Sequence, residues 1–238
     1  MSEETAEFVR LVRAAEDDEN VLGLVLSGSR GKGALVTSTS DWDVYVVVRE
    51  RPADPQFERG GRIERVVLTL DALREMDEWN RYAFAHVGPV LDKTGGEIER
   101  VVAELGRRDP STASELLDGY VNFYYRSLKN RELDLEVESR LDAAESMPWW
   151  LDFLFASHGR VRPYNKWLRW ELSAHPLSEP WSEHNVIHRV SRIVRYGDID
   201  DQRALFRATE AFARERGFGG VIDGWEPDVV LLRGQEWG

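Results

Sequence analysis

The sequence predicts an α+β protein, with a small mixed β-sheet domain followed by an all-helical bundle domain. Short apolar runs that suit strands all precede residue 93, whereas apolar side chains at helical spacing dominate after residue 110. Between the two regions, the stretch 109–111 (Asp-Pro-Ser) combines a proline stop with a serine cap. We therefore expect two domains, residues 1–109 and residues 110–238.

The expected elements of the first half follow from short patterns in the chain. The first helix has acidic residues in its first turn and an apolar stripe that includes Phe8 and Leu11. The strands are continuous apolar runs, rich in β-branched residues after Asp43. In order, we expect a helix over 2–15, strands over 21–26, 44–48 and 62–70, a helical segment over 71–79, a short strand over 89–92 and a helix over 97–105.

The sequence of the second half predicts helices. Apolar and aromatic side chains recur at helical spacing, which is typical of residues that pack a helical core. No stretch there has the pattern of a strand. The expected helices cover 111–130, 134–157, 182–196 and 200–216.

Composition restricts the class of protein. The chain has 238 residues, 42% of them hydrophobic, which is enough for a core in each of two domains. It has no cysteine, which excludes disulfides and thiolate metal sites. No apolar stretch approaches the ~20 residues of a membrane span, and acidic residues rather than a basic signal region follow Met1. We expect a cytoplasmic protein with no membrane contact.

The net charge bears on the choice of partner. The formal charge is -12, whereas proteins that bind nucleic acids draw most of their affinity from lysine and arginine side chains on phosphates. The balance therefore disfavours a polynucleotide substrate. An acidic surface instead favours a cationic small molecule.

The stretch Val21–Val48 contains the candidate chemistry. Gly28 and Ser29 follow the first apolar run, and Asp41 and Asp43 stand at the entrance to the second. Residues i and i+2 of a strand share a face at about 6–7 Å, so we expect the two carboxylates to project together and to need a cation between them. Carboxylates with phosphates and waters suit magnesium, and a bare glycine backbone suits a phosphate.

Glu64 is the candidate third acid. It stands near the start of the expected strand 62–70, where a strand beside Asp43 would bring it close to the acid pair. It could ligate a metal or remove a proton from an attacking hydroxyl. Asp71 is the weaker candidate, since about seven residues of strand separate it from Glu64 by more than 20 Å.

Other phosphate-binding motifs do not fit the glycine loop. A P-loop requires G-x-x-x-x-G-K-[ST], but Gly33 follows Gly31-Lys32 and Leu26 stands in place of the first glycine. The dinucleotide fingerprint G-x-G-x-x-G fails as well, because Val36 replaces its third glycine.

The run GSRGKG followed by SDWDVYVVV resembles the G-S…D-x-D signature of the DNA-polymerase-β-like nucleotidyltransferase superfamily. Within that superfamily the chain most resembles the bacterial aminoglycoside- and lincosamide-type nucleotidyltransferases, which carry a helical C-terminal domain. The resemblance covers roughly residues 21–71. It implies transfer of a nucleoside monophosphate, AMP from ATP being favoured, to a hydroxyl of a small-molecule acceptor, with antibiotic-like compounds among the candidates.

The resemblance also implies roles for individual residues. Gly28 and Ser29 would hold the triphosphate. By their position in the same loop, Arg30 and Lys32 are further candidate phosphate contacts, with a solvated loop lysine as the alternative for Lys32. Asp41 and Asp43 would bind magnesium and act in catalysis, and Glu64 would occupy the third acidic position, where the family often has aspartate. Two lysines of the helical half would contribute to nucleotide binding. These are Lys129 and Lys166.

Two other hypotheses remain open at this stage. In one the chemistry is the same but the acceptor is a side chain of a partner protein. In the other the chain is a non-catalytic nucleotide-binding module, and the acids form only a solvated strand entrance. The retained pair Asp41 and Asp43 favours catalysis, because two adjacent charges bring a non-catalytic module no advantage.

Overall fold

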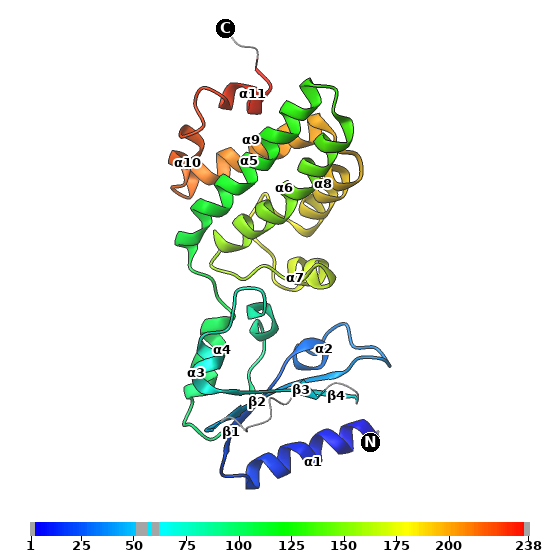
Figure 1. Cartoon of the computed structure of the whole chain (residues 1–238), viewed down its shortest axis with the longest axis vertical. Coiled ribbons are helices and arrows are strands. Elements are labelled where there is room, and N and C mark those ends of the chain that lie inside the picture. Colours follow the sequence, from blue (N-terminus) through cyan, green and yellow to red (C-terminus); the bar gives the residue numbers. More distant parts are fainter. Residues whose placement is uncertain (1–2, 51–56, 59–61, 236–238) are drawn as a thin grey trace. The chain divides into compact units, whose positions relative to one another are not determined.

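The computed structural model describes residues 3–50, 57–58 and 62–235, and Figure 1 shows its helices and strands. The chain divides into two compact units, Met1–Arg107 and Arg108–Gly238. The first contains the sheet, and the second is helical over the residues described. The α+β class, a mixed sheet with helices followed by a largely helical region, is therefore confirmed. No helix among the described residues is long and apolar enough to cross a membrane.

In its described residues the first unit contains five strands and the helices around them. In chain order its elements are α1 (Glu3–Asp17), β1 (Val21–Leu26), α2 (Gly28–Gly31), β2 (Trp42–Val48), β3 (Phe57–Glu58), β4 (Ile63–Thr69), α3 (Leu70–Arg74), the 3₁₀ helix η1 (Arg81–Phe84), β5 (Pro89–Asp92) and α4 (Glu97–Leu105). The strands form one sheet in the order β3-β4-β2-β1-β5. β2 and β4 run parallel, and the other neighbours run antiparallel, so the sheet is mixed.

Each face of the sheet has its own apolar cluster, because successive side chains of a strand point to opposite faces. On one face α1 packs on β2, where Phe8 stacks on Trp42 at 4.2 Å between ring centroids. On the other face side chains of α3, α4 and η1 pack around Val47 and Val25. Figure 1 shows α1 alone on its side of the sheet, with α2, α3 and α4 on the opposite side. Trp42 thus marks the α1 face, and Asp43 points to the other face.

The second unit is built from helices around a single apolar cluster. Its elements are η2 (Pro110–Thr112), α5 (Ala113–Glu132), α6 (Glu136–Ala156), η3 (Asn165–Trp167), α7 (Leu168–Ala174), α8 (Glu183–Tyr196), α9 (Ile199–Glu215), α10 (Gly219–Asp223) and α11 (Val229–Arg233). A three-residue turn joins α5 to α6, and the two long helices pack side by side (Figure 1). Buried Ser127 and Ser139 donate to each other's carbonyls at 2.8 Å, which fixes the register of the pair.

Several expected elements differ from the structure at their ends, and the elements β3, η1, η3, α7, α10 and α11 were not expected. The helical segment expected over 71–79 is the shorter helix α3, which begins after the N-cap Thr69, whose hydroxyl accepts from the amide of Ala72, and ends at Arg74. The strand expected over 44–48 begins earlier, at Trp42, whose amide donates to the carbonyl of Arg62 at 2.8 Å. Local patterns locate a strand, but the residues at its ends depend on the partner strand.

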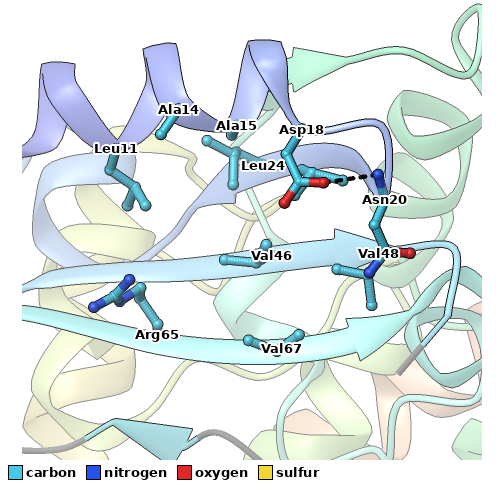
Figure 2. Close-up of a pocket in the computed structure, with 11 residues that line it drawn as sticks. Leu11, Ala14, Ala15, Asp18, Asn20, Leu24, Val46, Val48, Arg65 and Val67 are labelled. Carbon is cyan, nitrogen blue, oxygen red and sulfur yellow. Dashed lines mark hydrogen bonds between the residues drawn. The ribbon is translucent and has the colours of Figure 1, made fainter. Parts of the chain in front are cut away.

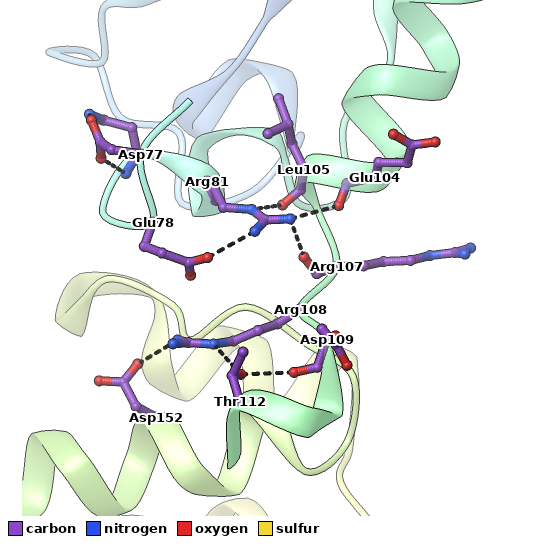
Figure 3. A network of polar contacts seen from close by, with 11 residues as sticks. Asp77, Glu78, Arg81, Glu104, Leu105, Arg107, Arg108, Asp109, Thr112 and Asp152 are labelled. Atoms are coloured by element: carbon purple, nitrogen blue, oxygen red, sulfur yellow. Dashed lines mark hydrogen bonds and ion pairs between the residues drawn. The ribbon is translucent and has the colours of Figure 1, made fainter. Parts of the chain in front are cut away.

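The division between the units falls between Arg107 and Arg108, and the sequence analysis placed it after residue 109. On the first side, Arg81 donates to the carbonyls of Glu104, Leu105 and Arg107 and so caps the C-terminus of α4 (Figure 3).

On the other side of the division, Arg108 bonds the Thr112 hydroxyl at 3.1 Å and pairs with Asp152 at 3.5 Å. Each unit therefore has an arginine next to the division whose guanidinium bonds to atoms of the same unit.

Candidate active site

Gly28 brings the backbone against a carboxylate. The chain leaves β1 and turns at Ser27, whose amide donates to the carbonyl of Asp43 at 2.8 Å. Gly28 then adopts φ +61°, a left-handed conformation that suits glycine. A Cβ atom built at Gly28 would lie 1.8 Å from Oδ2 of Asp43. Only a residue without a side chain lets the glycine turn and this carboxylate lie so close together.

Glu64 lies beside Asp43 in the sheet. β2 and β4 are parallel, and Asp43 pairs with Glu64 in their register. Their neighbours Trp42 and Ile63 point into the cluster under α1, so both acids point to the opposite face. Adjacent strands are about 4.8 Å apart, so the two carboxylates share a small region of that face. Both side chains are partly exposed.

Asp41 is placed differently from the expectation. β2 begins at Trp42, so Asp41 is an exposed residue of the preceding loop and not a residue of the strand. The alternation that the sequence analysis applied to Asp41 and Asp43 therefore holds for Asp43 alone. The direction of the Asp41 side chain depends on the loop 37–41. That loop is thus part of the candidate site.

Arg30 has several protein partners. Its Nε donates to the carbonyl of Ser40 at 3.1 Å, its guanidinium carbon lies 4.5 Å from the centroid of the Trp42 ring, and its Nη2 lies 3.6 Å from Oε2 of Glu4. Ser29 is buried, and its carbonyl accepts from the amide of Ala34 at 3.1 Å. The local sequence pattern could not predict the ion pair of Arg30 with Glu4, because Glu4 lies far away in the chain.

Lys32 holds the far end of the glycine loop. Its ammonium donates to the carbonyls of Tyr82 (3.1 Å), Ala83 (3.5 Å) and Ala85, and it lies 4.6 Å from the centroid of the Tyr82 ring. These carbonyls close η1. Both cations of the run GSRGKG therefore bind backbone oxygens.

The two lysines predicted to bind nucleotide belong to the second unit. Lys129 on α5 pairs with Glu132 at 2.9 Å, and the hydrogen bond to this carboxylate raises the pKa of the lysine. Lys166 in η3 is exposed, with its ammonium 5.6 Å from the centroid of the Trp167 ring. Their contact with a nucleotide stays a prediction.

The donor set restricts the kind of metal that could bind. Across residues 3–50, 57–58 and 62–235, no group of three or more histidine, aspartate or glutamate residues stands ready to hold a metal ion. A preformed cage, as zinc or calcium commonly has, does not fit this arrangement. Magnesium does fit, since it takes hard oxygen donors and commonly binds through one or two carboxylates with waters and substrate phosphates. Asp43 and Asp41 are the residues that could hold it.

A cavity of about 310 Å³ lies elsewhere in the same unit, between α1 and the sheet (Figure 2). Its lining is mostly aliphatic and includes Leu24, Val46 and Val48, with Arg65 and Asp18 as its charged members. These valines belong to the α1 face, whereas Asp43 and Glu64 lie on the opposite face. The cavity is therefore separate from the candidate active site.

No family model matches the sequence, and no curated protein matches it.

Proposed function

We propose that the protein is a magnesium-dependent nucleotidyltransferase that moves a nucleoside monophosphate, with AMP from ATP favoured, to a hydroxyl of a small-molecule acceptor. One observation supports this most. The bare backbone of Gly28 lies against the Asp43 carboxylate, and Glu64 stands in register beside it. A glycine turn without a side chain admits a phosphate, and the neighbouring carboxylates offer oxygen donors for its magnesium.

The residues of the site would have separate roles in this reaction. Asp43 and Asp41 would hold the magnesium–triphosphate complex, and the backbone of the Gly28 turn beside Asp43 is the proposed phosphate contact. Bound magnesium would offset the phosphate charge and stabilise the departing pyrophosphate. Lys129 and Lys166 are retained as proposed phosphate contacts.

Glu64 is the proposed general base. The acceptor oxygen attacks the α-phosphorus and its proton passes to the Glu64 carboxylate. The new bond joins the acceptor oxygen to phosphorus, while the bond between the α-phosphorus and the oxygen that bridges to the β-phosphate breaks. Pyrophosphate leaves with that electron pair. The position of Glu64 beside Asp43 supports this role, because a base must lie within reach of the reacting hydroxyl.

The test is transfer of an α-³²P label from each of the four nucleoside triphosphates, with magnesium, to an acceptor panel and to cell lysate. We expect Asp43→Asn to lower transfer by about a hundredfold or more, as when a charged group of a pre-organised site is removed. We expect Glu64→Gln to retain magnesium-dependent nucleotide binding but to lose turnover. Asp17→Asn, an exposed aspartate at the end of α1, is the matched control and should retain both.

The outcomes separate the hypotheses. Label in a protein band instead of the small-molecule fraction would select a protein acceptor. Binding of nucleotide without release of pyrophosphate would select a non-catalytic module. If the wild type neither binds nucleotide with magnesium nor releases pyrophosphate under these conditions, the proposed function is wrong. Full turnover by Glu64→Gln would remove Glu64 as the base.

A further inference from the structure

We propose that Arg30 is a positioning residue, which together with Glu4 and Arg62 holds the loop 37–41 that presents Asp41, and that it is not a phosphate ligand. The inference rests on the proposed function only where it concerns nucleotide and magnesium. Its structural part, the fixing of the loop by residues of another element, is a property of the first unit alone.

Three sides of the Arg30 guanidinium are occupied by protein. Nε donates to the Ser40 carbonyl at 3.1 Å, the planar group lies over the Trp42 ring at 4.5 Å, and Nη2 faces Glu4 at 3.6 Å. The side chain is only 18% exposed. A planar guanidinium can stack and donate at the same time, which an ammonium cannot do. A phosphate bound at Nε and Nη2 of Arg30 would displace both the Ser40 carbonyl and the Glu4 carboxylate.

Arg62 makes the matching contact at the other end of the same loop. Its Nη1 donates to the Ser38 carbonyl at 2.6 Å and also lies 3.0 Å from Oε1 of Glu4. Glu4 therefore stands between two arginines, with one carboxylate oxygen toward each. Each arginine in turn holds one carbonyl of the loop. We name Glu4, Arg30 and Arg62 the arginine clamp.

The loop also has bonds of its own. The Thr37 amide donates to the Ser40 hydroxyl at 2.8 Å, and the Ser40 amide donates to the Thr37 carbonyl at 3.2 Å. This turn fixes the loop internally, and the clamp ties it to α1, to α2 and to the residue before β4. Asp41 follows Ser40 directly, so its position depends on both. Loss of the Glu4 charge should loosen the loop even though Glu4 touches none of it in the hydrogen bonds described.

Hydrogen exchange tests the clamp without any ligand. In Glu4→Gln and in Arg30→Ala we expect amides of residues 37–41 to exchange about fivefold faster than in the wild type, the size of effect that coupled charges produce. Glu7→Gln, the same change at an exposed position of α1, should leave this exchange unchanged. Unchanged exchange in both clamp variants would overturn the proposal.

Binding of a fluorescent ATP analogue then separates positioning from phosphate contact. If Arg30 positions the loop, Glu4→Gln, Arg30→Ala and Arg30→Lys should each raise the magnesium concentration for half-maximal binding by about fivefold, while affinity in EDTA changes by less than about twofold. Lysine keeps the charge but cannot stack and donate in the same way.

A phosphate ligand would behave differently. Arg30→Ala would then weaken binding in EDTA, Arg30→Lys would largely restore it, and Glu4→Gln would have no effect. That pattern would overturn the positioning role. If the wild type bound no analogue with magnesium, the proposed function would fail, and hydrogen exchange would still decide whether the clamp holds the loop.

Discussion

At the scale of single residues, Gly28 and Asp43 together define the candidate site. Gly28 has a positive φ, and the Asp43 carboxylate occupies the space where its Cβ would stand. The sequence motif predicted that both residues matter. It did not predict that they touch, because the contact joins a turn to a strand and depends on the pairing of β1 with β2.

Gly28→Ala and Gly33→Ala form a matched pair that separates strain from collision. Both glycines have φ near +60°, but a Cβ at Gly33 meets nothing within 4 Å. We expect Gly33→Ala to lower the free energy of unfolding by about 1–2 kcal/mol through backbone strain alone. Gly28→Ala should lose a further 1–3 kcal/mol or so, because its Cβ displaces Asp43.

Urea unfolding measures the two free energies, and nucleotide binding with magnesium measures the site. Only Gly28→Ala should lose binding. Equal stability and equal binding in the two variants would show that the contact between Gly28 and Asp43 has no consequence.

His158 is a second residue whose environment has a measurable effect. Its Nδ1 contacts the Leu154 carbonyl at 2.7 Å, Nε2 contacts the Ser178 hydroxyl at 2.9 Å, and the ring stacks on Phe212. Burial lowers the pKa of His158 below its ordinary value of 6.5. The unfolded chain therefore takes up a proton at a higher pH than the folded protein does.

The sign of the pH dependence follows from this order. As pH falls below about 6.5, protonation favours the unfolded state, so the second unit should lose stability between about pH 7 and pH 5. In thermal unfolding across this range, the melting temperature should depend less steeply on pH for His158→Gln than for the wild type. His184→Gln, on the exposed side of α8, should keep the wild-type slope. Equal slopes for all three proteins would contradict a lowered pKa of His158 in the folded protein.

At the scale of elements, two lysines donate to backbone carbonyls at the ends of helices, where carbonyls lack the full set of helical partners. Lys32 donates to three carbonyls at the end of η1, and Lys93 donates to those of Ala15 (2.6 Å) and Asp18 (2.9 Å) at the end of α1. The sequence analysis treated Lys32 as a loop lysine. The structure gives it a role between two elements that lie far apart in the chain.

Lys32→Met tests this role. Methionine keeps much of the side-chain length but removes the ammonium that the three carbonyls share, which should lower the free energy of unfolding by about 1–3 kcal/mol. Arg10→Met, an exposed position on α1, is the control and should change it by less than about 0.5 kcal/mol. Urea unfolding gives both values. An equally small change in Lys32→Met would show that water replaces the lysine without cost.

At the scale of the whole molecule, the two units have separate apolar cores. The cluster of the second unit contains only residues of α5 and later elements or of the segments that join them, and the two clusters of the first unit contain only residues before Arg107. A core of its own allows a domain to fold alone. The second unit should therefore fold as a fragment.

The exact start of the fragment matters. Residues 108–238 retain the bonds of Arg108 to Thr112 and Asp152 and the bond from the Ser111 amide to Asp109. Residues 110–238, the domain predicted from the sequence, lose them and should be less stable by about 1–2 kcal/mol. Circular dichroism with thermal unfolding compares the two. Failure of both fragments to unfold cooperatively would contradict independent folding.

The sequence by itself determined the α+β class, the order of the longer helices and strands, and the glycine and acidic residues proposed for the candidate site. These depend on local patterns, such as alternation in a strand or apolar spacing in a helix. Only the tertiary structure decided that Glu64 stands beside Asp43, that Asp41 precedes the strand, and that Arg30 binds protein atoms.

The physical reason lies in strand pairing. A shift of one residue in register would place Arg65 or Ile63 beside Asp43 and turn the side chains of the shifted strand to the opposite face. Register and the contacts of Arg30 depend on segments far apart in the chain. They are decided only when those segments pack together.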